Sequence, residues 1–222
     1  MTGTPHSVRD LLRALPVFPV EMPEFDTTMA PGDPVTLFLD WLEDAIEYKI
    51  LGPQAMTLST VGRDGQVTSR VLILKDVDHD GRWYFASSSS SRKGQDLTMH
   101  PQAALSFYWS QLGRQVRIRG AVVPMPSSAS AVDFLARSPA SRAEALTGRQ
   151  SEPLADPAEL DEAFRTAQAQ VAADPGLVAP DWTLYGLSAD EVEFWQADHE
   201  RRHVRLHYRR TADGWTSLLL WP

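Results

Sequence analysis

The sequence predicts a mainly β protein, an antiparallel barrel with helices added early and late in the chain. Short apolar runs separated by turn signals follow one another from residue 56 to residue 123, as consecutive hairpins do. A helical pattern precedes these runs, and a second helical region follows them at about residues 128–173. Consecutive hairpins favour an antiparallel barrel over a doubly wound sheet.

The chain is expected to divide into an N-terminal arm, residues 1–35, and a single domain, residues 36–222. Prolines interrupt any regular period in the first segment, at positions 5, 16, 19, 23, 31 and 34. We expect an irregular arm that drapes over a partner subunit, and a disordered tail is the alternative for residues 1–10. The chain of 222 residues is long enough for one domain with a sizeable core.

Hydrophobic periodicity places the elements of the domain in order. Apolar residues at positions 37, 38, 41, 42, 45 and 46 have the spacing of an amphipathic helix. Residues 56–61 and 68–75 form a predicted hairpin, because the turn signal Arg63-Asp64-Gly65 separates them. A short polar helix is expected at Gly94. Further strands are predicted at residues 83–86, 103–109, 115–123, 192–196, 203–209 and 215–220.

Composition narrows the possible functions. The formal net charge of -8 at pH 7 disfavours a nonspecific nucleic-acid binder, yet arginines crowd at positions 201, 202, 205, 209 and 210, as in a local pocket for a small anion. The lack of cysteine excludes disulfides and thiolate-metal sites. No apolar run approaches the roughly 20 residues of a membrane span, and the N-terminus lacks a signal-peptide pattern. We therefore expect a cytoplasmic protein without a membrane or nucleic-acid partner.

The motif Ser91-Arg92-Lys93-Gly94 lies where a predicted strand gives way to a helix. Backbone N–H groups at a helix start attract anions, and two adjacent cations strengthen that attraction. The motif is therefore a candidate phosphate site, although in isolation a solvated polar loop explains it as well.

The strand from Arg70 to Lys75 has a cation at each end of an apolar run. The run is expected to be buried and could pack against a flat ring system. Charges that simply flank a core strand are the alternative.

The segment from Arg114 to Gly120 alternates strictly. Gln115, Arg117 and Arg119 share one face, whereas Val116 and Ile118 occupy the other, which we expect to be the core. The Gln115 amide could pair with the edge of a heterocycle. A solvent-exposed face is the alternative.

The most specific pattern is Trp195 followed by Arg201, His203 and Arg205. Strand alternation would point the last three side chains the same way and form a site for an anionic heteroaromatic ligand. His199, His203 and His207 have a helical spacing typical of zinc ligands, but the β-type alternation and the neighbouring cations argue against a metal, and none is predicted.

Taken in order, these elements resemble the pyridoxine/pyridoxamine 5'-phosphate oxidase family, from about Met56 to Pro222. The motifs that carry the resemblance are R-V-L-I-L-K (70–75), S-R-K-G (91–94), R-Q-V-R-I-R-G (114–120), R-Q-S (149–151), E-F-W-Q (193–196) and R-x-H-x-R-L (201–206). Each motif is weak alone, but the six in this order are specific.

The resemblance implies an FMN-binding split β-barrel that acts as a homodimer, with two FMN sites at the subunit interface and a dimerisation and substrate segment at the C-terminus. Arg92 and Lys93 would hold the FMN phosphate, and Gln115 would face the isoalloxazine edge. The implied FMN-binding residues are Arg70, Val71, Leu72, Ile73, Lys75, Ala86, Ser87, Arg92, Lys93, Gln115, Gln150, Ser151, Trp195 and Arg205.

The resemblance also implies a small phosphorylated pyridine as substrate. Lys75, Arg137 and Ser141 would hold its phosphate, and Arg201 and His203 would contact its ring as the catalytic residues. The implied reaction converts pyridoxine 5'-phosphate or pyridoxamine 5'-phosphate to pyridoxal 5'-phosphate, with a hydride passing to the flavin and O2 reoxidising it to release H2O2.

The sequence departs from the family pattern at the substrate site. Asp133 stands where the family usually has a tyrosine that binds the substrate phosphate, and a carboxylate there repels phosphate unless it turns away or pairs with Arg137. Arg202 replaces a common leucine, Ala86 replaces a tyrosine, and residues 143–146 lack the usual apolar and tryptophan pattern. These departures concern the substrate more than FMN.

Two alternatives remain open. The first is a sibling flavin oxidase of secondary metabolism that acts on a phenazine-type dihydro-aromatic substrate, because R-Q-S-E (149–152) and F-P-x-E-x-P-E-F (18–25) resemble that branch, although Lys75 argues against it. The second is a non-catalytic flavin- or haem-binding split barrel, which the pair Arg201 and His203 argues against.

Overall fold

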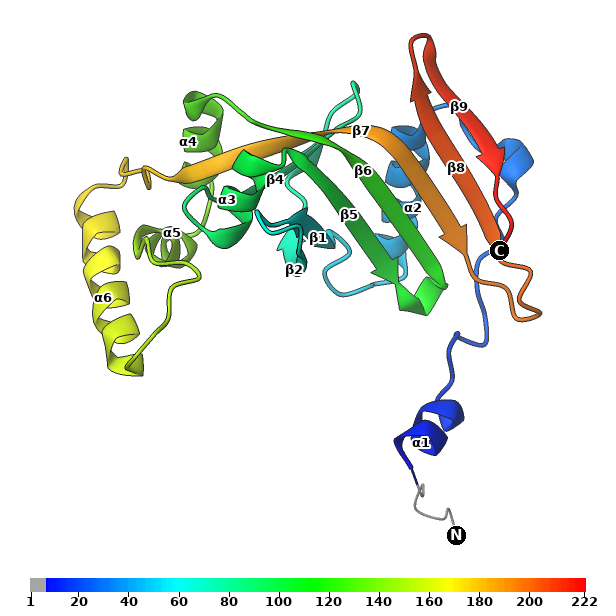
Figure 1. The fold of residues 1–222 in the computed structure, drawn as a ribbon, viewed down its shortest axis with the longest axis horizontal. Coiled ribbons are helices and arrows are strands. Elements are labelled where there is room, and N and C mark those ends of the chain that lie inside the picture. Colours follow the sequence, from blue (N-terminus) through cyan, green and yellow to red (C-terminus); the bar gives the residue numbers. More distant parts are fainter. Residues whose placement is uncertain (1–6) are drawn as a thin grey trace.

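Antiparallel pairing joins nine strands into one curled sheet within residues 7–222, the part of the chain that the computed structural model describes (Figure 1). The sheet order is β2-β1-β5-β6-β7-β4-β3, and β8 pairs with β7 and β9. The strands are β1 (Ala55–Val61), β2 (Val67–Ile73), β3 (Asp76–Val77), β4 (Arg82–Ser88), β5 (Gln102–Trp109), β6 (Arg114–Pro124), β7 (Trp182–Gln196), β8 (Val204–Thr211) and β9 (Gly214–Leu219). The predicted mainly β, antiparallel fold is confirmed.

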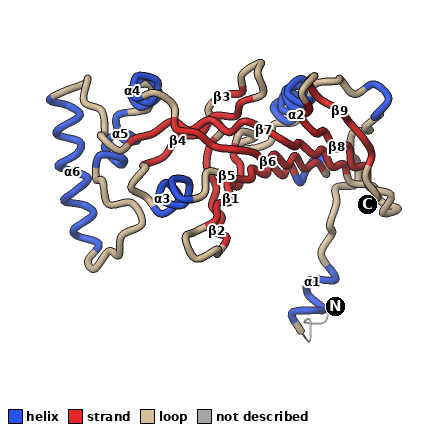
Figure 2. Tube along the Cα trace, turned by 45° about the horizontal axis from the view of Figure 1, so that its top comes forward, coloured by secondary structure: helices blue, strands red, loops and turns tan. Residues whose placement is uncertain are grey.

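Helices pack at both ends of this sheet. Figure 2 shows α4, α5 and α6 together at one end and α2 near the strands of the other end. The region predicted as helical from about residue 128 to residue 173 is three helices, α4 to α6, with a loop at residues 147–156. The helices are α1 (Val8–Ala14), η1 (Thr27–Met29), α2 (Pro34–Glu47), α3 (Arg92–Met99), η2 (Ser110–Leu112), α4 (Ser127–Leu135), α5 (Pro139–Leu146) and α6 (Pro157–Ala173).

The apolar face of α2 packs on the sheet and forms the centre of the main core. Asp33 caps this helix by accepting a hydrogen bond from the Thr36 backbone N–H at 2.9 Å, and Pro34 occupies its first turn, where no N–H is needed. Phe38 is fully buried, with its ring centroid 4.4 Å from that of Trp83 in β4. Burial of one such side chain contributes about 1.5–3 kcal/mol to folding.

Strand β7 is longer than the sequence pattern predicts. The alternation suggests a strand at residues 192–196, whereas β7 begins at Trp182 and pairs with β4 over its first half, with β8 over its second half and with β6 along both. Gly186 and the pair Ala189-Asp190 interrupt the alternation of large side chains. At that pair the register with β6 shifts, because Arg119 lies opposite Glu191 while Gly120 lies opposite Ala189.

The N-terminal arm is not irregular throughout. Ser7 caps the short helix α1 by accepting a hydrogen bond from the Asp10 backbone N–H, and none of the residues of α1 is buried. This helix projects from the body of the molecule in Figure 1. Residues 1–6 of the predicted arm lie outside the described residues. Within the described part of the chain, no helix combines the length and apolar character needed to cross a membrane.

Replacement of Gly120 by alanine tests the close approach of β6 and β7 at the register shift. A Cβ atom on Gly120 would overlap the Ser188 backbone carbonyl, so the strands would have to separate. We expect Gly120→Ala to lower the free energy of unfolding by about 1–3 kcal/mol in urea denaturation, the usual cost of overpacking. A Cβ atom on Gly32 meets no atom within 4 Å, so Gly32→Ala is the matched control and should change stability by less than about 0.5 kcal/mol. Equal midpoints for the two variants would contradict the tight approach.

Candidate active site

The first group of predicted site residues gathers where β4 gives way to α3. Ser91 caps α3, since its Oγ accepts a hydrogen bond from the Gly94 backbone N–H at 3.3 Å. A side chain at Gly94 would overlap the Ser89 backbone, so only glycine lets the helix start this close to the end of the strand. The motif predicted as a phosphate site is therefore a tight strand-to-helix turn with its N–H groups at a helix start.

Lys93 is a buried cation in this turn. It is 7% exposed, and its Nζ lies 3.0 Å from Gln150 Oε1 and 3.2 Å from Ser91 Oγ. Among the described residues, no carboxylate lies within ion-pair distance of Lys93. Burial is the main cause, and the positive charge of Arg70 a second one, of a pKa for Lys93 that is lowered to about 8. A buried lysine with only neutral partners indicates an anion-binding position.

Arg70 and Ser87 lie around the same turn. The Arg70 guanidinium donates to Thr60 Oγ1 at 2.8 Å and to Thr68 Oγ1 at 2.7 Å, and it lies 3.9 Å from the Asp96 carboxylate. Ser87 Oγ donates to Gln150 Oε1 at 3.4 Å. We call Arg70, Ser87, Arg92, Lys93 and Gln150 the cradle. Arg92 is exposed at its rim.

The strand β2 was expected to be buried, and this expectation is wrong for the single chain. It lies at the edge of the sheet and pairs only with β1, so Val71 is 66% and Ile73 is 46% exposed. The exposed residues alternate along the strand, so one face of β2 is left uncovered by the described chain. This partly apolar face therefore remains available to a ligand or a partner.

A second group lies at the far end of β7. Gln115 in β6 is opposite Trp195 in β7, and Trp195 is opposite Arg205 in β8. The centroid of the His203 ring lies 5.0 Å from that of Trp195. The Asp198 backbone N–H donates to His203 Nδ1 at 3.0 Å, so the neutral ring carries its proton on Nε2. We call Gln115, Trp195, Arg201, His203 and Arg205 the ring group.

Phe18 from the N-terminal arm packs against the ring group. Its ring centroid lies 5.6 Å from that of His203, and the Arg201 guanidinium lies 5.6 Å from the Phe18 ring. Arg201 has a positive φ of 67°, which a non-glycine residue rarely adopts. Sequence reasoning missed Phe18, because a single phenylalanine in a proline-rich arm has no periodic signal.

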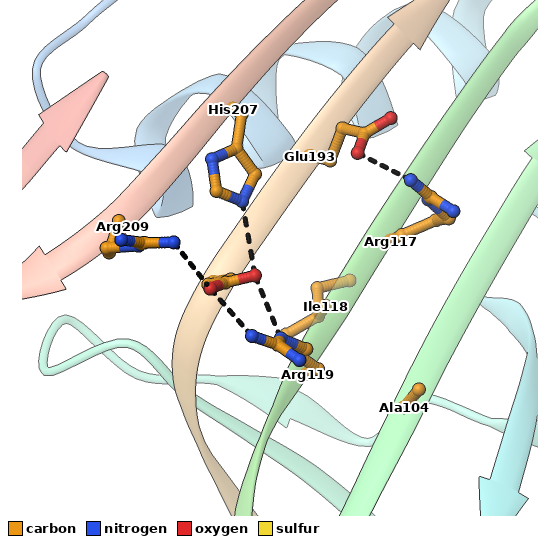
Figure 3. Close-up of a pocket in the computed structure, with 8 residues that line it drawn as sticks. Ala104, Arg117, Ile118, Arg119, Glu193, His207 and Arg209 are labelled. Carbon is orange, nitrogen blue, oxygen red and sulfur yellow. Dashed lines mark hydrogen bonds and ion pairs between the residues drawn. The ribbon is translucent and has the colours of Figure 1, made fainter. Parts of the chain in front are cut away.

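Of the five arginines expected to form one basic pocket, three pair with carboxylates: Arg202 with Glu200, Arg205 with Glu193 and Arg209 with Glu191. Two arginines of β6 join these pairs, since Arg117 pairs with Glu193, as Figure 3 shows, and Arg119 pairs with Glu191. The hydrogen bond from Arg119 is the largest effect that holds the pKa of Glu191 at about 2. Carboxylates thus balance the charge of three of the five arginines, so the sequence interpretation of a single basic pocket is wrong.

Arg205 also pairs with a carboxylate of its own chain. Its Nε donates to Glu193 Oε1 at 3.0 Å, and its Nη1 donates to the Trp221 backbone carbonyl at 2.8 Å. The Glu193 carboxylate has the largest part in raising the pKa of Arg205, so this side chain stays charged. Its charge is therefore largely balanced within the chain.

A third group, the anion subsite, is formed by Lys75, Asp133, Arg137 and Ser141. Asp133 pairs with Lys75 at 3.2 Å and accepts a hydrogen bond from Trp182 Nε1 at 2.8 Å. It does not pair with Arg137, the partner considered from the sequence. Arg137 instead pairs with Glu144 at 3.4 Å. Ser141 Oγ accepts from Ser138 Oγ at 2.9 Å.

The cradle and the ring group do not meet in one chain. Trp182 is the first residue of β7, and Trp195 lies near its end. The thirteen residues of strand from one to the other span roughly 40 Å. Figure 1 likewise places α3 and the start of β8 in opposite halves of the molecule. Of the remaining predicted residues, Ala86 is buried at 9% exposure, whereas Ser151 is exposed with a φ of 76° in the loop after α5.

Comparison with known proteins shows which family this chain belongs to. A family model described as pyridoxamine 5'-phosphate oxidase matches residues 42–196, and one described as pyridoxine 5'-phosphate oxidase C-terminal dimerisation region matches residues 182–222. The chain belongs to the pyridoxamine 5'-phosphate oxidase family. The resemblance expected from the six motifs is thus confirmed.

Relatives of this family match most of the chain. The chain is 41% identical over 194 residues to a pyridoxine/pyridoxamine 5'-phosphate oxidase of Thermosynechococcus vestitus, with 87% of this chain and 90% of that one covered. It is 40% identical over 196 residues to the same-named protein of Caulobacter vibrioides, with 87% of each covered. Among solved structures, PhzG from Burkholderia lata in complex with tetrahydrophenazine-1-carboxylic acid has a TM-score of 0.80 and 32% identity, and the match covers 93% of this chain and 100% of that one.

The low pKa of Lys93 makes anion binding at the cradle dependent on pH. With a pKa of about 8 in the free protein, Lys93 loses its proton above that pH, and binding of an anion must then restore the proton. We expect the Kd for FMN, followed by quenching of flavin fluorescence, to be flat from about pH 7 to about pH 8 and to rise by up to about tenfold per pH unit above pH 8.

The matched control for this prediction is the exposed Lys49. Lys49→Gln should keep the pH profile, whereas Lys93→Gln should bind FMN more weakly and without the rise above pH 8. A rise that survives in Lys93→Gln would assign the titration to another group.

Proposed function

We propose that the protein is a cytoplasmic FMN-dependent oxidase that converts pyridoxine 5'-phosphate or pyridoxamine 5'-phosphate to pyridoxal 5'-phosphate, with O2 as acceptor and H2O2 released. The observation that carries the proposal is the buried Lys93 at the start of α3, which forms no ion pair with a carboxylate of the described residues. Membership of the oxidase family and the names of relatives at about 40% identity support the same reaction.

The chemistry of the cradle fits the phosphate of FMN. Lys93 supplies a charge that lacks a counterion, Arg92 supplies a second charge at the rim, and the backbone N–H groups of the first turn of α3 supply neutral donors. Bound FMN would supply the redox chemistry, accepting a hydride and passing electrons to O2.

The separation of the cradle from the ring group supports a homodimer. A site that needs both groups is incomplete within one chain, because they lie in opposite halves of the molecule. The C-terminal region that matches the family's dimerisation region contains Trp195, His203 and Arg205. We therefore propose that each site takes its cradle from one protomer and its ring group from the partner, related by two-fold symmetry.

The ring group would orient the substrate and control its protons. The Nε2–H of neutral His203 is a hydrogen-bond donor, and Arg201 is a fixed positive charge next to it. Together they can stabilise negative charge on the pyridine substituents and hold the reacting carbon in place. Lys75, Arg137 and Ser141 would bind the anionic end of the substrate.

A phenazine-type dihydro-aromatic acid is a second candidate substrate. Asp133 paired to Lys75 reduces the net positive charge available to a phosphate. The Burkholderia lata relative, which was solved with tetrahydrophenazine-1-carboxylic acid, matches 93% of this chain. These two observations favour the second candidate over a non-catalytic role.

Anaerobic titration of the FMN-loaded protein with pyridoxine 5'-phosphate tests the proposed reaction. We expect stoichiometric loss of the flavin's visible absorption and its return when air is admitted, because a hydride enters the flavin and O2 removes it. Pyridoxine without the phosphate is the control and should reduce the flavin more slowly. Flavin that binds but stays oxidised with pyridoxine 5'-phosphate would refute this substrate, and reduction by a dihydrophenazine carboxylic acid would then establish the second candidate.

Two variants separate the roles of the cradle and the ring group. We expect Arg92→Ala to weaken FMN retention and Arg201→Ala to lose substrate turnover with FMN retained, because the two side chains belong to different groups. Loss of flavin from Arg201→Ala would show that this division of roles is wrong.

A purified heterodimer of the two variants tests whether sites are shared between protomers. One of its two sites would combine both intact groups, so it should keep about half of the wild-type turnover. Turnover is measured without added FMN, where the Arg92→Ala homodimer has lost flavin. If each site lay within one chain, both sites of the heterodimer would be defective, and turnover would equal the mean of the two homodimers, below half of the wild-type value.

A further inference from the structure

The side chains of the anion subsite are already paired within the chain. Lys75 is bound by Asp133 at 3.2 Å, and the Asp133 carboxylate is largely buried, with 13% of its side chain exposed. Trp182 Nε1 donates to the second oxygen of the same carboxylate at 2.8 Å, which holds it in place. Asp133 is therefore fixed beside Lys75 and cannot simply turn into solvent.

Arg137 is a largely buried cation with room for one more hydrogen-bond acceptor. Its guanidinium lies 4.0 Å from the centroid of the Trp182 ring, and only 15% of its side chain is exposed. Its Nη2 pairs with Glu144, while Nη1 is a buried nitrogen that has no hydrogen-bond partner among residues 7–222. An unsatisfied buried donor of this kind indicates a position where a ligand acceptor belongs.

The charges of the anion subsite cancel before any ligand arrives. Two cations, Lys75 and Arg137, face two carboxylates, Asp133 and Glu144. A phosphate dianion brings two negative charges to this neutral group, whereas a carboxylate brings one. Asp133 thus repels the dianion about twice as strongly as the monoanion, and the repulsion acts in a partly buried place where solvent screens it little.

We propose that Asp133 is a specificity-determining residue that lowers the preference of the anion subsite for phosphate over carboxylate. The inference rests on the proposed function, because it concerns the anionic end of the same ring substrate. Asp133 acts on ligand charge through Lys75, and Glu144 acts in the same direction on Arg137. The subsite therefore accepts ring substrates that carry a carboxylate.

Binding to the FMN-loaded protein tests this inference without turnover. The probes are 4'-deoxypyridoxine 5'-phosphate, which has no C4' oxygen to oxidise, its analogue with a carboxymethyl group in place of the phosphorylated hydroxymethyl, and 4'-deoxypyridoxine itself. Kd values come from the change that each probe causes in the flavin's visible absorption. Asp133→Asn keeps an oxygen for Trp182 and removes the charge, so the fold is preserved.

We expect Asp133→Asn to tighten binding of the phosphate probe by about tenfold, to tighten the carboxylate probe by less, and to leave the uncharged probe unchanged. Glu144→Gln should act in the same direction with a smaller effect, because 57% of the Glu144 side chain is exposed. Glu162→Gln, with 77% of its side chain exposed on α6, is the matched control for a lost carboxylate and should change none of the three values.

An Asp133→Asn variant with an unchanged ratio of phosphate to carboxylate affinity would overturn the inference, and so would equal tightening of all three probes, which indicates a change of shape. Failure of the proposed function is distinguishable, since it appears as flavin that pyridoxine 5'-phosphate does not reduce, whatever the binding ratio.

Discussion

The pairing of β7 with three other strands is the constraint on which the rest of the structure depends. Its first half pairs with β4 and so fixes the turn from β4 into α3. Its second half pairs with β8, which forms the C-terminal hairpin with β9. The register shift opposite Gly120 lets one strand serve both halves of the curled sheet. Trp182 at its start supports Asp133, and Trp195 near its end supports His203. One strand thus positions the residues of two separate groups.

The cations of this chain differ in whether a carboxylate balances their charge, and this difference is more informative than their number. Lys93 is buried beside neutral oxygens, whereas Lys75 and Arg205 are matched by Asp133 and Glu193. A buried cation without a counterion is costly unless an anion arrives, so it is the strongest sign of a ligand. A cation that is already paired with a carboxylate instead limits the additional negative charge that a ligand can bring to the site.

Local patterns predicted much of this architecture. The 3.6-residue period of α2, the turn before β2, the helix start at Ser91 and the alternation of Val116 and Ile118 are properties of neighbouring residues, and the structure confirms them. Contacts between distant segments were not predictable, such as Asp133 with Lys75. The exposure of β2 was also missed, because a run of apolar residues does not reveal whether both faces of its strand are covered.

If the proposed shared sites form, the placement of the cradle and the ring group in opposite halves of the chain couples assembly to cofactor supply. Where two protomers complete each site, a ligand held by both lowers the free energy of the dimer and not that of the separated chains. By linkage, the affinity for FMN depends on the protein concentration, and the dimer persists at greater dilution when FMN is abundant. A shortage of flavin would then favour the separated chains, in which the apolar side chains of Val71 and Ile73 are exposed.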